Sequence, residues 1–189
     1  MKNTKDMTVA FDHSLYINAV LCWFSMDDCN TACTLLDPGM VLSANDGPQI
    51  DEERTKMWTI PYHELISTLT WIVVVSQPDI SFSTTYLMHF NMNPGQMHQK
   101  AAMHVLHYLR RTVDYQLTMG CHLGDPGELT TYVDSNWGCD IDICHSVSRY
   151  IFLFGNSAIS WSVKQQTTVA ASSTEAEYLS ISHTACQGL

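Results

Sequence analysis

The fold is decided by VDSNWGCD (residues 133–140), followed by YIFLFGNSAISWSVKQQ (150–166) and SSTEAEYLSIS (172–182). Side chains alternate through residues 130–135, which predicts a strand with Asp134 near its end, on the face that carries Thr130 and Tyr132. Two further apolar runs predict two more strands. The Ser/Thr cluster that follows predicts the start of a helix, with Glu175 and Glu177 in its first turn.

This order of carboxylates is typical of metal-dependent nucleases. Carboxylate oxygens are the ligands that Mg²⁺ prefers, and paired ions stabilise both oxygens of a phosphodiester displacement. We therefore expect Asp134 and Glu177 to converge on one pocket, strand end against helix start. From residue types alone a second interpretation stays open, because acidic residues in a first turn also complement the helix dipole and a strand Asp is often a solvated edge residue.

The run from residue 130 to 182 resembles the ribonuclease H segment of copia-type retrotransposon polyproteins. That pattern is a strand with an Asp followed by ADWAGD, then YVF-L-G, ISW-S-KQ and SSTEAEY. The fold that the resemblance implies is α+β or α/β, with a helical connection followed by a truncated ribonuclease H-like module. The module comprises a three-stranded antiparallel sheet and its first helix.

The upstream sequence resembles the same polyproteins, from Tyr16 onward. YINAVLCWFSMDDCN and LLDPGMVLS look like the end of the reverse transcriptase, and IPYHELISTLTWI with the run after SQPDIS looks like the connection. The resemblance implies a reverse transcriptase remnant and linker in residues 1–60, the helical connection in 61–120 and the ribonuclease H-like part in 128–189. No YxDD run occurs, so we expect no polymerase activity.

Carried over by position, the resemblance makes Asp134 the strand carboxylate and Glu177 the helix carboxylate, as catalytic residues and as ligands of Mg²⁺. It implies an RNA/DNA hybrid as the substrate and the remainder of the polyprotein as a partner. Glu175 is then a capping residue and Asp140 a loop residue. Arg149 departs from the pattern, because it stands where the family has Gly, and a reshaped turn is expected there.

The chain ends soon after the Glu177 helix, whereas the resemblance implies a later strand with another catalytic Asp. Two carboxylates leave most of an octahedral Mg²⁺ shell to water. We therefore expect this polypeptide alone not to cleave a hybrid. We also expect its Asp134 strand to be an exposed edge, open to self-association. The alternative is a non-catalytic product of a decayed element that acts as a protein or nucleic-acid interaction module.

Composition indicates a globular chain of 189 residues without a targeting signal. The strongest apolar run, WIVVV (71–75), is too short to span a bilayer, which predicts a cytoplasmic or nuclear protein that is neither secreted nor bound to a membrane. Seven cysteines without a secretion signal predict free thiols. Cys139, Cys144 and His145 fit no standard zinc spacing and are interpreted as loop residues.

A net charge of −10 argues against tight nucleic-acid binding. One helix near residues 96–111 departs from this, because it has an apolar stripe of Ala102, Val105, Leu106 and Leu109. The opposite face carries Lys100, His104, His107 and Arg111. These four residues are candidates for contact with a phosphate backbone, although an ordinary solvated face explains them as well.

The remaining chain predicts helices over residues 15–24, 61–76 and 78–91, with an irregular start before residue 14 and a long loop over 27–54. In the helix that begins at Pro61, Leu65, Leu69, Ile72 and Val73 form the expected core face. A turn cluster, GCHLGDPGEL (120–129), is the expected boundary between the connection and the strand-rich module. Trp161 is interpreted as core packing and Trp137 as core or as the wall of a substrate groove.

Overall fold

The computed structural model describes residues 2–3, 8–120 and 127–188, and the chain divides into two compact units. One unit is Phe11–Gln116, and the other combines Met1–Ala10 with Leu117–Leu189. Helices and a three-stranded antiparallel sheet occur together, which confirms the α+β class. The division of the chain into three ancestral segments (1–60, 61–120 and 128–189) stays a prediction, because compactness does not report ancestry.

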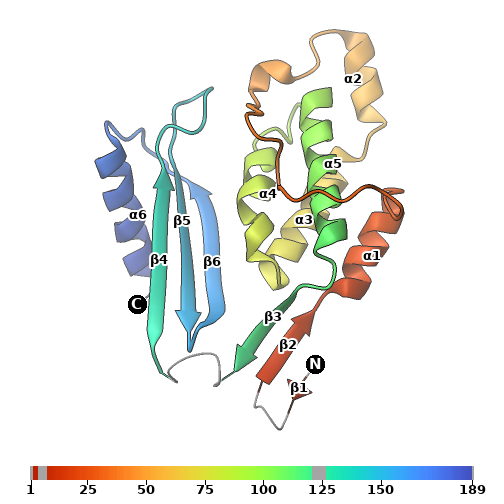
Figure 1. Cartoon of the computed structure of the whole chain (residues 1–189). Helices are drawn as coiled ribbons and strands as arrows, with labels where there is room; N and C mark the ends of the chain where they lie inside the picture. Colours follow the sequence, from red (N-terminus) through yellow and green to blue (C-terminus); the bar gives the residue numbers. More distant parts are fainter. Residues whose placement is uncertain (1, 4–7, 121–126, 189) are drawn as a thin grey trace. The chain divides into compact units, whose positions relative to one another are not determined.

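The unit Phe11–Gln116 is helical (Figure 1). Its α-helices are α1 (Ser14–Trp23), α2 (Asp51–Trp58), α3 (Tyr62–Val75), α4 (Ser81–Met88) and α5 (Gln96–Arg111). Short 3₁₀ turns, η1 (Ala44–Asp46) and η2 (Pro78–Ile80), precede α2 and α4. The predictions of helices over 15–24 and 61–76 are confirmed within a residue or two, and the predicted helix over 78–91 is η2 followed by α4.

The core of this unit lies between α1, α3, α4 and α5. The predicted α5 stripe is confirmed, since Ala102, Val105, Leu106 and Leu109 are fully buried. From α3, Leu65, Leu69 and Ile72 are fully buried and Val73 packs against the same cluster. The Tyr62 hydroxyl donates to the carbonyl of Leu87 (2.7 Å), so the only polar atom of this buried ring is satisfied.

A buried histidine ties the start of α5 to the loop before η1. His98 is fully buried, and its ring stacks on Phe90 with 4.0 Å between centroids. The Gly95 N–H donates to Nδ1 (2.8 Å), so the ring proton lies on Nε2, 3.1 Å from the carbonyl of Ser43. A neutral imidazole with this one tautomer joins the two segments.

Two elements of the N-terminal part differ from the prediction. The start of the chain is not wholly irregular, because β1 (Lys2–Asn3) and β2 (Thr8–Asp12) form a sheet with β3 (Gln116–Gly120) in the order β1-β2-β3. The predicted loop over 27–54 is also interrupted, by η1 and by the first turn of α2. Three acidic residues in that turn (Asp51, Glu52 and Glu53) complement the helix dipole, while the helix lacks an apolar stripe that a pattern search would find.

The second sheet consists of β4 (Leu129–Asn136), β5 (Val147–Phe154) and β6 (Ser157–Gln165), all antiparallel and in that order (Figure 1). The strand predicted around Asp134 and the two that follow it are therefore confirmed. Gly155 and Asn156 connect β5 to β6, both with positive φ (54° and 64°). This conformation at two central residues matches the right-handed twist of a hairpin and explains the Gly-Asn pair.

Helix α6 (Ser173–Gln187) lies along β4 and β5 (Figure 1). Its N-cap is Ser172, whose Oγ accepts from the Glu175 N–H (3.2 Å). Buried contacts of α6 are small or polar, since Ala176, Ser180 and Thr184 form its inner face. Most of the predicted boundary over 120–129 lies outside the described residues, at 121–126. Among the helices described, none is long and apolar enough to cross a membrane.

Candidate carboxylate site

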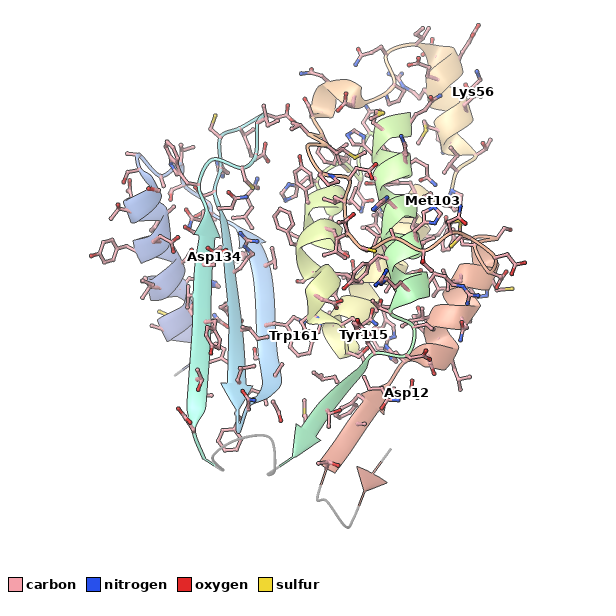
Figure 2. The ribbon with its side chains drawn as sticks, in the orientation of Figure 1. Asp12, Lys56, Met103, Tyr115, Asp134 and Trp161 are labelled. Atoms are coloured by element: carbon pink, nitrogen blue, oxygen red, sulfur yellow. The ribbon has the colours of Figure 1, made fainter. Side chains whose placement is uncertain are left out.

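Asp134 lies two residues before the end of β4, where Figure 2 labels it. Its partner across the ladder is Arg149 of β5, and the Arg149 Nη2 lies 2.7 Å from the Asp134 Oδ2. The side chains are 34% (Arg149) and 60% (Asp134) exposed, so solvent screens this ion pair only in part. One carboxylate oxygen of Asp134, the predicted metal ligand, is thus already paired with the Arg149 guanidinium group.

Strand alternation determines which face of the sheet carries Asp134. The neighbouring Ser135 pairs with Ser148, and the Ser180 hydroxyl of α6 donates to the Ser148 Oγ (2.7 Å). Helix α6 therefore covers the face that carries Ser135 and Ser148. Because successive strand side chains point to opposite faces, Asp134 and Arg149 lie on the other face.

The two predicted ligands are consequently not brought onto one face of the sheet. Glu177 is half-buried on α6. Its predicted place in the first turn is wrong, because only Glu175 of the two lies there and Glu177 follows in the next turn. Glu175 has the capping role expected for it, because its Oε2 accepts from the Ala171 N–H (2.7 Å). Among the residues that the structure describes, no group of three or more His, Cys, Asp or Glu side chains is placed to hold a metal ion. The expected convergence of Asp134 and Glu177 is not observed in this arrangement.

Arg149 does not reshape the backbone as its replacement of a glycine suggested. It lies within the regular part of β5 and is absent from the residues with positive φ. The left-handed positions between β4 and β5 are Gly138 (φ 56°) and Cys144 (φ 55°). Arginine is tolerated at position 149 because the strand there is extended.

The turn after β4 is organised by Asp140. Its Oδ1 accepts from the backbone N–H groups of Asp142 and Ile143, and its Oδ2 accepts from Gln165 Nε2 (2.7 Å). These bonds satisfy a carboxylate within the loop and agree with the loop role expected for Asp140. Burial raises the pKa of the neighbouring Cys139 thiol, which favours its neutral form.

The two tryptophans of the module have different surroundings. The Trp137 indole Nε1–H donates to the carbonyl of Ala170 (2.9 Å), while 53% of the residue stays exposed. Trp137 therefore links the end of β4 to the segment before α6. Trp161, labelled in Figure 2, pairs with Ile151 and lies half-buried on the Asp134 face, not in the interface beneath α6.

The predicted basic face of α5 is occupied by residues 30–37. The His104 Nε2 lies 3.0 Å from the Thr34 carbonyl, and its Nδ1 lies 3.4 Å from Asp37 Oδ1. The His107 Nδ1 bonds the carbonyl of Asn30, and the Arg111 guanidinium donates to Cys33 Sγ (2.7 Å). Lys100 is exposed. Contact of this face with a phosphate backbone stays a prediction. For His104, His107 and Arg111, such contact requires displacement of residues 30–37.

Sequence reasoning had no access to these pairings. His104 contacts Thr34 across 70 positions of the chain, and Arg111 contacts Cys33 across 78. The Asp134–Arg149 pair also depends on strand register, although opposite charges on adjacent predicted strands were a usable signal.

Comparison with known proteins places the chain among mobile genetic elements. Over 169 residues, 89% of the chain, it is 36% identical to the retrovirus-related Pol polyprotein from transposon TNT 1-94 of Nicotiana tabacum. Over 172 residues, 91% of the chain, it is 30% identical to the corresponding polyprotein from transposon RE1 of Arabidopsis thaliana. The chain belongs to the retrovirus-related Pol polyproteins of transposons.

The chain spans only 12% and 11% of these two Pol polyproteins. It is also 33% identical over 126 residues to the secreted RxLR effector protein 161 of Plasmopara viticola, covering 67% of this chain and 87% of that protein. No family model matches the chain. No solved structure matches it either. Membership in the transposon Pol polyproteins thus rests on sequence identity.

Proposed function

We propose that residues 128–189 are part of a ribonuclease H-like module of a copia-type Pol polyprotein. In this proposal, residues 1–60 are a reverse transcriptase remnant and residues 61–120 are the connection. The supporting observation is the order of elements: a strand ending near Asp134, two antiparallel strands, and a helix with Glu177 in its first turns. The identity to a transposon Pol polyprotein covers 89% of the chain.

The chemistry of this proposal uses Mg²⁺ and an RNA/DNA hybrid. Asp134 and Glu177 would be the ligands present in this chain, and carboxylates at a divalent ion stabilise the charge that develops on the phosphodiester. Their separation by the sheet, and the Arg149 guanidinium on Asp134, disfavour a shared ion. We therefore propose that this polypeptide alone does not hydrolyse a hybrid.

A hybrid-cleavage assay on the full chain, with Mg²⁺ or Mn²⁺, tests the proposed inactivity. We expect no cleavage above a protein-free control. Cleavage that disappears in Asp134→Asn and persists in Asp142→Asn, a substitution in the exposed turn, would contradict it. The ancestry is tested separately by an experimental structure of the full chain, which must keep the order β4-β5-β6 with α6 on β4 and β5.

A second function, self-association, is favoured by the position of β4. Within the described sheet β4 has a partner on one side only, and Leu129 and Tyr132 are 52% and 61% exposed along it. An edge strand of this kind can pair with the same strand of a second copy. We expect sedimentation at rising concentration to reveal a dimer that Tyr132→Lys weakens, while Tyr178→Lys, on the outer surface of α6, leaves it unchanged. Monomers throughout the concentration range would refute this function.

A further inference from the structure

A small pocket lies between the end of β6, the segment that follows it, and the side of α6. Its volume is about 170 Å³. All the residues around it belong to the unit that contains the second sheet: Ser148, Lys164, Gln165, Gln166, Thr167, Thr168, Leu179 and His183. None of the functions proposed above uses this pocket.

The pocket combines positive charge with hydroxyl groups. Lys164 is exposed at its rim, and His183 contributes an imidazole that lies 6.2 Å, between centroids, from the Tyr150 ring. Thr167 and Thr168 add two exposed hydroxyl groups. Ammonium, imidazole and hydroxyl groups all donate hydrogen bonds to the oxygens of an anion.

Among the residues that the structure describes, none of those lining the pocket is acidic, and the carboxylates of Asp140 and Glu175 are hydrogen-bonded elsewhere. Asp140 bonds Gln165, whose alternation along β6 places it on the face opposite to Lys164. Glu175 accepts from the Ala171 N–H at the helix start. Residues 127–188 contain one arginine, Arg149, and one lysine, Lys164. Arg149 is paired with Asp134 on the other face of the sheet, whereas Lys164 forms no ion pair with any residue that the structure describes.

The floor of the pocket is rigidly built. Gln166 is only 9% exposed, and its Nε2 donates to the Ser148 Oγ and to the Ala176 carbonyl, both at 2.9 Å. Its Oε1 exposes less than 1 Å², so this acceptor does not present its partial negative charge to the opening. The buried amide thus links the residue that follows β6 to both the sheet and α6.

We propose that this pocket binds one phosphate group. Its volume is below the roughly 300 Å³ at which pockets begin to enclose drug-sized molecules. The donors therefore match a single tetrahedral oxyanion with its attached group outside. The source is either a phosphomonoester, free phosphate included, or a phosphodiester of a nucleic-acid backbone. Neither source requires a metal ion or ribonuclease H-like ancestry.

The test uses the ¹⁵N-labelled full chain, titrated with inorganic phosphate at constant ionic strength and followed by amide chemical shifts. We expect saturable shifts confined to residues 164–168 and to the amide of His183. Lys164→Gln should weaken binding roughly tenfold, because one charge-assisted contact contributes about 1.5 kcal/mol. Lys56→Gln is the matched control, since it removes an equal charge from an exposed position on α2 and should leave the affinity unchanged.

Two further titrations identify the source of the phosphate. A dinucleoside monophosphate supplies only a phosphodiester, and a 5′-mononucleotide supplies only a phosphomonoester. Saturable shifts at the pocket with either one support the proposal and name the source. Shifts that never saturate, or that Lys164→Gln and Lys56→Gln reduce alike, indicate general charge screening and overturn it. Thr168→Val, which preserves side-chain volume, must also weaken binding if the hydroxyl takes part.

Discussion

Replacing Arg149 with alanine should make Asp134 available to a divalent cation. In the wild-type chain the guanidinium lies 2.7 Å from the Asp134 carboxylate and competes for the same oxygens. Both side chains are at least a third exposed, so the ion pair should stabilise the fold by the amount typical of a surface salt bridge. That amount is about 0.2–1 kcal/mol.

The same electrostatics sets the expected gain in cation affinity. Two unit charges about 4 Å apart interact by about 1 kcal/mol in bulk water and by several times more at a protein surface. Taking the lower figure because of exposure, we expect Arg149→Ala to tighten Mn²⁺ binding at Asp134 about fivefold. The free energy of unfolding should fall by less than about 1 kcal/mol.

Paramagnetic broadening of amide signals by Mn²⁺ measures this effect at single residues. We expect broadening around Asp134 at lower Mn²⁺ concentrations in Arg149→Ala than in wild type. Lys164→Ala is the matched control, because it removes the same charge from the opposite face of the same sheet. Equal broadening around Asp134 in wild type and Arg149→Ala would refute the reasoning, and so would an equal gain in the lysine variant.

Three further predictions concern stability. Burial lowers the pKa of His13 below its usual 6.5, so between the two pKa values the unfolded chain binds a proton that the folded chain does not. The free energy of unfolding should therefore fall as the pH drops below about 6.5 and level off below the folded pKa. In thermal melts, the melting temperature of His13→Gln should depend less steeply on pH over this range than that of wild type. Gly95→Ala would place a methyl group 1.8 Å from the Asp46 carbonyl oxygen, and urea denaturation should show the helical unit destabilised by about 3 kcal/mol. Gly188→Ala is the control, because its nearest contact would be 3.2 Å away on the Phe152 ring; it should lower the free energy of unfolding by less than about 1 kcal/mol. Gln166→Leu would remove the amide bonds to Ser148 Oγ and to the Ala176 carbonyl beneath α6, and should lower the melting point of the sheet-containing unit, at a cost of about 1–3 kcal/mol for the two bonds. Gln187→Leu, exposed at the end of α6, should leave the melting point unchanged.

Local pattern predicted the elements that carry a clear period. The α5 stripe and the α3 core face repeat at helical spacing, and the alternation around Asp134 repeats at strand spacing, so all three were found. The Gly155–Asn156 hairpin likewise follows from residues adjacent in the chain.

Elements that depend on distant partners were missed. Strand β2 has few signals of its own and is defined by its place beside β3, about a hundred residues later in the chain. Helix α2 is polar on every side and therefore lacks a period. The pattern correctly separated Asp134 from its neighbours by face, but only the packing of Ser180 on Ser148 revealed which face α6 covers.

The polar inner face of α6 has a consequence for motion. In the helical unit, α3 and α5 bury leucine, isoleucine and valine, whereas α6 rests on the sheet through serine, threonine, alanine and a glutamine amide. Water can replace these hydrogen bonds when the helix lifts, and the apolar area then uncovered belongs mainly to Phe152 and Tyr150 of the sheet. We therefore expect α6 to detach at a smaller free-energy cost than α5, which buries a stripe of apolar side chains. Amide protons of α6 should accordingly exchange with deuterium well before those at the centre of α5, and proteases should find their first cut near this helix.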